Sequence, residues 1–203
     1  MKQAALGFRV HSGWTALVAL AVTKGAPAVL ARERVHLVKT FTYQFRQPYH
    51  AAARLPADEG RAFVSRMQAE ARGLALRAIR DARARLEEQG YELTRCGLLL
   101  ASGRALPRLP QILASHALIH TADGELFREG LIHACGRCGL EAMKIKEKEL
   151  LGFASEALHL KASVLQSRMK EIGRPFGSPW SQDEKFASLV AWLALASRSS
   201  ARA

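Results

Sequence analysis

The sequence predicts an α/β fold in which helices flank a mixed five-stranded sheet. Three observations indicate this fold: three short strand-like segments open the chain, a long amphipathic helix follows them, and a continuous apolar run from Cys96 to Ser102 comes after that helix. A meander followed by helix-crossed strands joins antiparallel pairs to parallel ones. A chain of 203 residues supports one full-sized core. We therefore expect residues 1–203 to form a single domain.

The first three strands are separated by residues typical of turns. The segment from Leu6 to Val22 has Ser12-Gly13 at its middle, which predicts two strands joined by a tight turn. Lys24-Gly25-Ala26-Pro27 marks a second turn, and Ala28 to Val38 is the third predicted strand. Basic and apolar residues do not alternate strictly in this third strand, so the pattern does not assign its exposed face.

A connection and a long helix come next. Residues 39–55 mix aromatic and basic side chains; we interpret them as a loop anchored to the core, with base stacking as the alternative. Pro56 to Gly90 predicts a helix with acidic residues in its first turn. Helical spacing gives an apolar face of Phe63, Met67, Ala71, Leu74, Ala78, Ala82 and Leu86. The opposite arc carries Arg61, Arg66, Arg72, Arg77, Arg80 and Arg83 and is interpreted as a solvated face, or alternatively as a phosphate-tracking ridge.

The remaining elements follow in alternation. The apolar segment from Tyr91 to Ser102 predicts a buried central parallel strand. Helical sequence runs from Gln111 to Cys138, and residues 140–150 contain a short alternating segment typical of an edge strand. Further helical sequence covers residues 152–172, a Gly/Pro break covers 173–179, and a final helix is expected over 181–197.

This order of elements, together with Gly7-Phe8-Arg9-Val10-His11-Ser12-Gly13-Trp14, resembles the ribonuclease-H-like superfamily in its RuvC-type resolvase form. The family's first strand carries a catalytic Asp where this sequence has Arg9. Its fourth strand ends in a Glu, whereas the matching run here ends Leu100-Ala101-Ser102-Gly103. Its last helix carries metal-binding Asp residues, to which only Asp183 and Glu184 correspond.

These departures decide which function the resemblance implies. Two-metal cleavage of a phosphodiester needs clustered carboxylates, because two divalent cations must be held by oxygen ligands. An arginine at one of those positions adds charge of the wrong sign. We therefore expect a nucleic-acid-associated protein that keeps the ribonuclease-H-like fold and lacks the usual two-metal nuclease site.

The charge of the chain favours a polyanionic partner. Lys and Arg number 30 against 18 Asp and Glu, a formal net charge of +12, and the sequence pI is about 10.3. DNA and RNA fit this charge equally. Residues after the central strand are included as candidates because open α/β sheets bind ligands at that edge. The candidate phosphate contacts are Arg9, His11, Arg61, Arg72, Arg83, Arg104 and Arg108.

Two alternatives remain open at this point. The first is a metal-dependent nuclease or other hydrolase that uses a divalent ion, with Glu125, Asp183 and Glu184 as catalytic candidates beside a histidine pair. The second is a non-enzymatic module that forms a homo-oligomer through the apolar final helix, with a surface of Phe186, Leu189, Val190, Trp192 and Leu193.

Two places in the chain have a spacing that metal ligands use. His116, His120 and Asp123 fall on one face of a continuous helix, a spacing that suits a transition metal. His133, Cys135 and Cys138 resemble half of a zinc site, but a second Cys pair of that kind is missing from the sequence.

The sequence also bears on location. Its longest apolar runs, Thr15 to Val22 and Phe186 to Ala196, are well short of the roughly 20 residues that cross a bilayer. The first residues lead directly into a strand pattern, without the features of a signal peptide. The odd number of cysteines, three, does not suggest a disulfide framework. We expect a cytoplasmic protein without a membrane partner.

Overall fold

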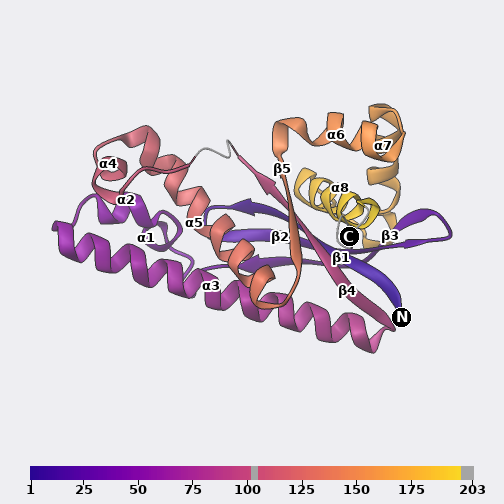
Figure 1. Ribbon diagram of the computed structural model, residues 1–203, viewed down its shortest axis with the longest axis horizontal. Helices are drawn as coiled ribbons and strands as arrows, with labels where there is room; N and C mark the ends of the chain where they lie inside the picture. The colour runs from indigo at the N-terminus through magenta and orange to yellow at the C-terminus, as the bar shows by residue number, and fades with distance from the viewer. Residues whose placement is uncertain (102–104, 198–203) are drawn as a thin grey trace, which may run out of the picture.

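The computed structural model describes residues 1–101 and 105–197. Within them, five strands form one mixed sheet in the order β3-β2-β1-β4-β5 (Figure 1). β1 pairs with β2 and β2 with β3 antiparallel, whereas β1 with β4 and β4 with β5 are parallel. This confirms the predicted fold class and element order. The strands are β1 Lys2–His11, β2 Trp14–Thr23, β3 Ala26–His36, β4 Tyr91–Leu100 and β5 Glu141–Lys146.

The two hairpin turns lie where glycine predicts them. Gly13 and Gly25 have φ angles of 83° and 78°, in the left-handed region that glycine adopts without a steric penalty. In the β2–β3 pair, Ala19 lies opposite Ala31 but Leu20 lies opposite Val29. β3 therefore holds one extra residue, a bulge that explains why its basic and apolar residues do not alternate.

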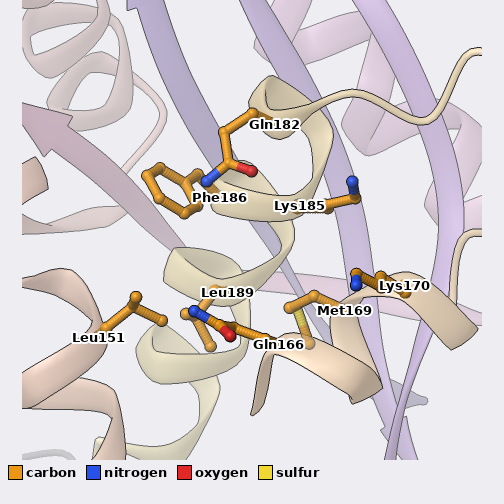
Figure 2. Close-up of a pocket in the computed structure, with 8 residues that line it drawn as sticks. All are labelled: Leu151, Gln166, Met169, Lys170, Gln182, Lys185, Phe186 and Leu189. Atoms are coloured by element: carbon orange, nitrogen blue, oxygen red, sulfur yellow. The ribbon is translucent and has the colours of Figure 1, made fainter. Parts of the chain in front are cut away.

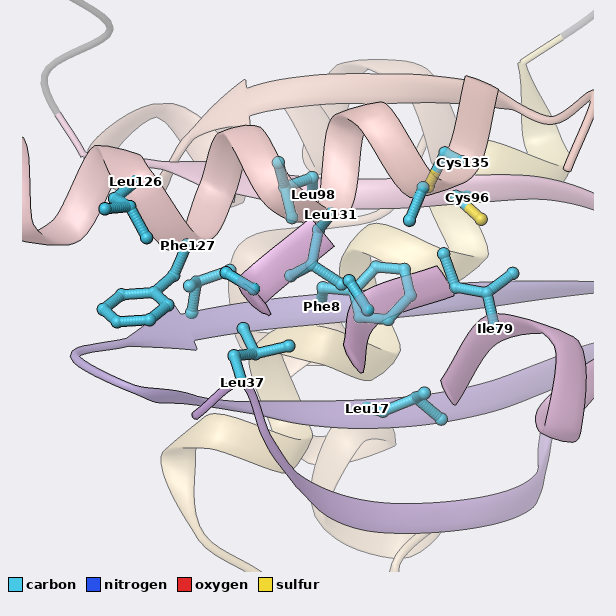
Figure 3. Close-up of a cluster of buried hydrophobic side chains, with 14 of the residues drawn as sticks. Phe8, Leu17, Leu37, Ile79, Cys96, Leu98, Leu126, Phe127, Leu131 and Cys135 are labelled. Carbon is cyan, nitrogen blue, oxygen red and sulfur yellow. The ribbon is translucent and has the colours of Figure 1, made fainter. Parts of the chain in front are cut away.

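One face of the sheet is covered by two helices, α3 (Ala57–Glu88) and α5 (His116–Arg137). Figure 3 shows the apolar side chains between these helices and the strands, with Phe8 and Leu17 from the sheet facing Ile79 of α3 and Leu131 of α5. Cys96 and Cys135 are also buried in this core. Their mutual hydrogen bond and their burial raise the pKa of Cys96 well above its ordinary value.

The buried stripe of α3 differs from the predicted one. Val64, Ala75 and Ile79 are buried there, whereas Phe63, Leu74 and Ala78 are only half-buried. The buried face of α3 is therefore rotated about the helix axis relative to the predicted one. It follows residues 64, 67, 71, 75, 79, 82 and 86, which pack on the sheet and α5. The apolar residues of this helix are spread so broadly that the sequence is compatible with both faces.

The other face of the sheet is covered by α8 (Gln182–Ala196), with α6 (Leu150–Leu158) and α7 (Ala162–Glu171) packed outside it (Figure 1). Two glycines on neighbouring strands allow the close approach of α8. Gly7 lies opposite Gly97, and a Cβ atom on them would stand 1.8 Å from the Ala187 carbonyl oxygen and 2.4 Å from that of Val190. The helix backbone therefore lies directly on the sheet.

This packing changes the interpretation of the final helix. Leu189, Val190, Trp192 and Leu193 are all buried within the chain itself. These four residues therefore do not form the free apolar surface that the sequence predicts, because the sheet and helices α6 and α7 already cover them, while Phe186 is half-buried. In the part of the chain that the structure describes, no helix has the length and apolar character to span a membrane.

Three segments are more broken than the sequence predicts. The helix expected over 111–138 is two, α4 (Leu109–Leu113) and α5. The one expected over 152–172 is also two, α6 and α7, separated at His159, whose φ of 52° is left-handed. The connection over 39–55 contains two short helices, α1 (Tyr43–Arg46) and α2 (Pro48–Ala52), and single 3-10 turns cover Glu147–Glu149 and Arg174–Phe176.

Candidate functional site

Arg9 holds two carboxylates together at the end of β1. Its Nε and Nη2 donate to the two carboxylate oxygens of Glu147, at 2.9 and 2.6 Å, in a bidentate pair. Its Nη1 donates to Oδ1 of Asp183. Strand β1, the 3-10 turn that follows β5, and helix α8 thus meet at one guanidinium, which also lies 5.2 Å from the ring centroid of Phe186.

The start of α8 fixes the position of Asp183. Ser181 caps the helix: its hydroxyl accepts from the backbone N–H of Asp183 at 3.0 Å, and its own N–H donates to Glu184 at 2.8 Å. Glu184 is therefore used within the cap. Of the two acidic residues predicted for this helix, only Asp183 reaches the Arg9 cluster.

The electrostatics of the cluster favour a permanently charged Arg9. The hydrogen bond from Arg9 to Glu147 raises the pKa of Arg9 above its ordinary high value, although burial acts in the opposite direction. Both oxygens of Glu147 and Oδ1 of Asp183 already accept hydrogen bonds from the guanidinium. The cluster contains fixed positive charge between two carboxylates, the reverse of a site whose carboxylates collect divalent cations.

Two neighbouring rows of side chains cross the sheet here, one that contains Arg9 and one that contains His11. Arg9 lies opposite Ala16 and Ala16 opposite Arg34, so these three share the face that α8 covers. In the next row, His11 lies opposite Trp14 and stacks on it, with ring centroids 4.3 Å apart. The His11 Nε2 atom is 2.8 Å from Asp183 Oδ1.

An open hollow of about 500 Å³ adjoins these rows. Its lining includes Trp14 and Ala16, the basic side chains of Arg32 and Arg34, and the acidic side chains of Glu33, Asp183 and Glu184. The guanidinium of the exposed Arg34 lies 3.9 Å from the Trp14 ring centroid, a cation–π contact. The hollow therefore combines an aromatic face with two arginines and three carboxylates, beside the Arg9 cluster.

The other predicted phosphate contacts lie elsewhere. Arg61, Arg72 and Arg83 belong to α3, which covers the opposite face of the sheet from α8. Arg72 is paired with Glu129 of α5 at 2.7 Å, and Arg83 donates to the Cys138 carbonyl at 2.7 Å.

The other three candidates are Arg61 on α3, and Arg104 and Arg108 after β4. Arg61 is exposed near the start of α3, and Arg108 is exposed before α4. Arg104 lies outside the described residues. Of the predicted contacts that lie in the described residues, the structure brings together Arg9 and His11.

Glu125 does not join the catalytic candidates of α8. Its carboxylate pairs with Arg128 on the same helix at 3.1 Å. Glu125, Asp183 and Glu184 therefore do not share one site. Glu125 is in an ion pair on α5, and Glu184 is in the N-terminal cap of α8.

A separate histidine cluster lies where α2 meets α5. Imidazole nitrogens of His50, His116 and His120 are all within 4.8 Å of one another. Asp123, which the sequence groups with the α5 histidines as a ligand, is buried behind them and contacts His50 instead, with Oδ2 2.5 Å from Nδ1. Burial raises the pKa of Asp123, while hydrogen bonds from His50 and the Tyr49 N–H act against this. His50 therefore takes the place predicted for Asp123.

A smaller pocket of about 130 Å³ lies between α6, α7 and α8. Figure 2 shows Leu151, Met169 and Leu189 lining it, with Lys170 and Lys185 on the same side. Four apolar residues and four polar ones line it: Leu151, Met169, Phe186 and Leu189, with Gln166, Lys170, Gln182 and Lys185.

Sequence patterns did not reveal Glu147, His50 or Arg34 as site residues. Glu147 is 138 residues from Arg9 and His50 is 73 from Asp123. Arg34 is part of the basic and apolar mixture that departs from strict alternation in β3. The sequence does not show the bulge that places Arg34 on the same face as Trp14.

Comparison with known proteins supports the fold. No protein-family model matches the chain, and no curated protein matches it in sequence. Among solved structures, it is similar to T. thermophilus RuvC in complex with a Holliday junction substrate, with 13% identity, a TM-score of 0.51, and coverage of 94% of this chain and 91% of that chain. A structure titled Thermus thermophilus RuvC is also similar, with 13% identity, a TM-score of 0.49 and coverage of 94% and 92%. At 13% identity, the first likeness shows the fold and confirms the predicted ribonuclease-H-like topology of RuvC type.

Proposed function

We propose that this chain binds the phosphate backbone of nucleic acid at the Arg9 end of its sheet and does not cleave it by the two-metal route. The observation that carries the proposal is the pairing of Arg9 with Glu147 and Asp183. Arg9 stands at the position where the resembling family has a metal-binding Asp. Its guanidinium gives the two carboxylates the positive partner that metal ions would otherwise supply.

The surroundings of Arg9 suit a polyanion with planar bases. His11, Trp14 and Arg34 line one edge of the sheet, and Arg34 is exposed over the indole. Arginine pairs well with phosphate through its planar donor fork. His11 and Arg34 already contact the Trp14 ring, so a base gains the roughly 1–3 kcal/mol of aromatic stacking only by displacing one of them. The net charge of +12 adds long-range attraction.

The similar structure supplies a first probe. RuvC of T. thermophilus is described in complex with a Holliday junction substrate. We therefore expect a labelled four-way DNA junction to bind, with duplex DNA, single-stranded DNA and RNA of the same length as comparisons. Fluorescence anisotropy over a series of salt concentrations measures each affinity, which should fall steeply as salt increases.

Two variants locate the surface. Trp14→Ala and Arg34→Ala should each weaken binding by roughly 5- to 100-fold, the range of one lost stack or charge-assisted contact. Arg137→Ala is the matched control, because Arg137 is exposed at the far end of α5 and removes the same charge. Incubation of the junction with Mg²⁺ or Mn²⁺ should leave it uncut. Affinity that is absent, insensitive to salt, or lowered equally by the control contradicts the proposal, as does cleavage of the junction.

A further inference from the structure

The three histidines where α2 meets α5 carry chemistry that the proposed nucleic-acid surface does not use. His116 and His120 lie one turn apart on α5, and His50 approaches them from α2. Their ring centroids are 4.4 to 5.4 Å apart, and each pair of rings meets edge to face. Among the described residues, this is the group of three or more His, Cys, Asp or Glu side chains close enough to hold a metal ion.

A buried carboxylate orients one of the three imidazoles. Asp123 has 2% of its surface exposed, and its Oδ1 accepts the Tyr49 N–H at 2.7 Å. Its Oδ2 is 2.5 Å from His50 Nδ1. An ionised carboxylate at this place accepts from Nδ1–H, the tautomer that leaves the Nε2 lone pair for a metal. A carboxylate behind a ligating histidine fixes the tautomer and makes the imidazole a stronger donor to a metal.

We propose that His50, His116 and His120 bind one first-row transition metal ion, most favourably Zn²⁺, with Asp123 as the positioning residue for His50. Three imidazoles are a ligand set that zinc uses when its fourth position is open. The negative charge of Asp123 also balances part of the charge of a divalent ion.

The geometry is within reach of such an ion. Zinc–nitrogen bonds of about 2.0–2.1 Å at tetrahedral angles place the nitrogens roughly 3.3 Å apart. The imidazole nitrogens are already within 4.8 Å, and His116 and His120 are exposed, so small side-chain rotations close the remaining gap. His50, held by Asp123, provides the fixed point.

The fourth coordination position is open to solvent or to an anion. His120 also lines a hollow of about 360 Å³ at the end of β1, together with His11, Ser12 and Arg128. An ion held by these histidines would therefore lie beside a hollow with a basic wall, where water or an anionic group could complete its coordination.

Metal analysis of the full chain without a histidine tag tests the proposal. The protein is dialysed against Zn²⁺, freed of loosely bound ion by passage through a weak chelator, and analysed by mass spectrometry for zinc. We expect one ion per chain. The same sample prepared with Co²⁺ should show the visible absorption of a tetrahedral nitrogen-rich site.

Four variants make the test specific. The double variant His116→Ala/His120→Ala should lose the ion and the cobalt absorption; both side chains are exposed, so circular dichroism should show an unchanged fold. His50→Ala should also lose it. Asp123→Asn should lower affinity by about 10- to 100-fold and alter the cobalt spectrum. His133→Ala, an exposed histidine of α5 outside the cluster, is the matched control and should bind normally.

The outcomes decide the proposal without reference to nucleic acid. A wild-type chain that holds neither zinc nor cobalt overturns it and leaves the three rings as an edge-to-face packing cluster. Equal metal content in wild type and the His116→Ala/His120→Ala variant also overturns it, because the ion then lies elsewhere. An unchanged cobalt spectrum in a folded Asp123→Asn variant removes the positioning role of Asp123.

Discussion

Arg9 links three segments of the chain through one side chain. Its guanidinium reaches Glu147 after β5 and Asp183 in the first turn of α8, and His11 contacts the same Asp183 oxygen. These four side chains are 19–38% exposed, so water only partly screens their charges. Removing the arginine would leave two carboxylates facing each other without a cation.

Replacing the arginine by an acid should reverse the electrostatics of this site. Arg9→Asp places a third carboxylate beside Glu147 and Asp183. We expect it to cost about 1–3 kcal/mol, less than the 3–5 kcal/mol of breaking a fully buried pair, because the site is partly exposed. In EDTA, the unfolding temperature should fall by roughly 3–10 °C. Mg²⁺ or Mn²⁺ should recover part of that loss, because three clustered carboxylates attract a divalent cation.

The matched control is Arg9→Met, which removes the charge without adding a ligand. Its unfolding temperature should also fall, but added Mg²⁺ or Mn²⁺ should not restore it. The same melting temperature for wild type and Arg9→Asp, or equal metal effects in both variants, would show that the cluster does not hold its carboxylates in the way described.

At the residue scale, the sequence shows all but one side chain of each site: it misses Glu147 in the Arg9 cluster and His50 in the histidine cluster. Arg9 is visible as an exception to a strand motif, and Asp183 is visible as an acidic residue that opens the final helix, where the resembling family has metal-binding Asp residues. Glu147 is not predictable, because only the parallel pairing of β4 with β5 brings the end of β5 to the level of Arg9. His50 is missed for a related reason: it lies in a connection whose two short helices leave no periodic signal.

Helix α8 positions Asp183, and two facing glycines position α8. Gly7 and Gly97 leave room for the carbonyls of Ala187 and Val190 on the sheet surface. The strands were predictable because turn residues such as Gly13 and Gly25 separate them. The helix breaks at Ser115 and His159 were not predictable, because neither residue is a glycine or a proline, the residues that usually mark a helix break.

A methyl group on the sheet under α8 should therefore disturb both fold and site. In Gly7→Ala the new Cβ would meet the Ala187 carbonyl oxygen at 1.8 Å, so α8 must shift. Overpacking costs about 1–3 kcal/mol and more where backbone is the obstacle, so we expect a loss of about 3 kcal/mol in urea unfolding. Gly73→Ala is the control: Gly73 is exposed in the middle of α3 with no neighbouring atom within 4 Å, and it should gain about 0.5–1 kcal/mol. Equal stability of Gly7→Ala and wild type would contradict the close packing.

Across the whole molecule, basic residues divide between two faces. Arg9 and Arg34 lie on the face that α8 covers, and the exposed arginines of α3 lie on the other. The net charge of +12 gave the sign of the expected partner, but it could not separate these faces, because charge counts carry no information on which helix covers which side.

We expect residues 1–203 to unfold as a single domain. Both hydrophobic clusters use the same sheet, one through Phe8 and Leu98 and the other through Leu20 and Leu99. Loss of either helical layer therefore exposes strands that the other layer needs. Far-ultraviolet circular dichroism and the fluorescence of Trp14, Trp180 and Trp192 should give coincident urea transitions. Two separated transitions would indicate independent folding units.

The packing of α8 on β1 also sets an order of events during synthesis. Contacts of Arg9 with Glu147 and Asp183 span 138 and 174 residues, and the ribosome makes β1 long before it makes α8. Until α8 emerges, the apolar face formed by Leu20 and Leu99 has no cover. During that time the nascent chain exposes an apolar sheet surface that could aggregate with other chains. Chaperones that bind apolar segments would protect it in this period.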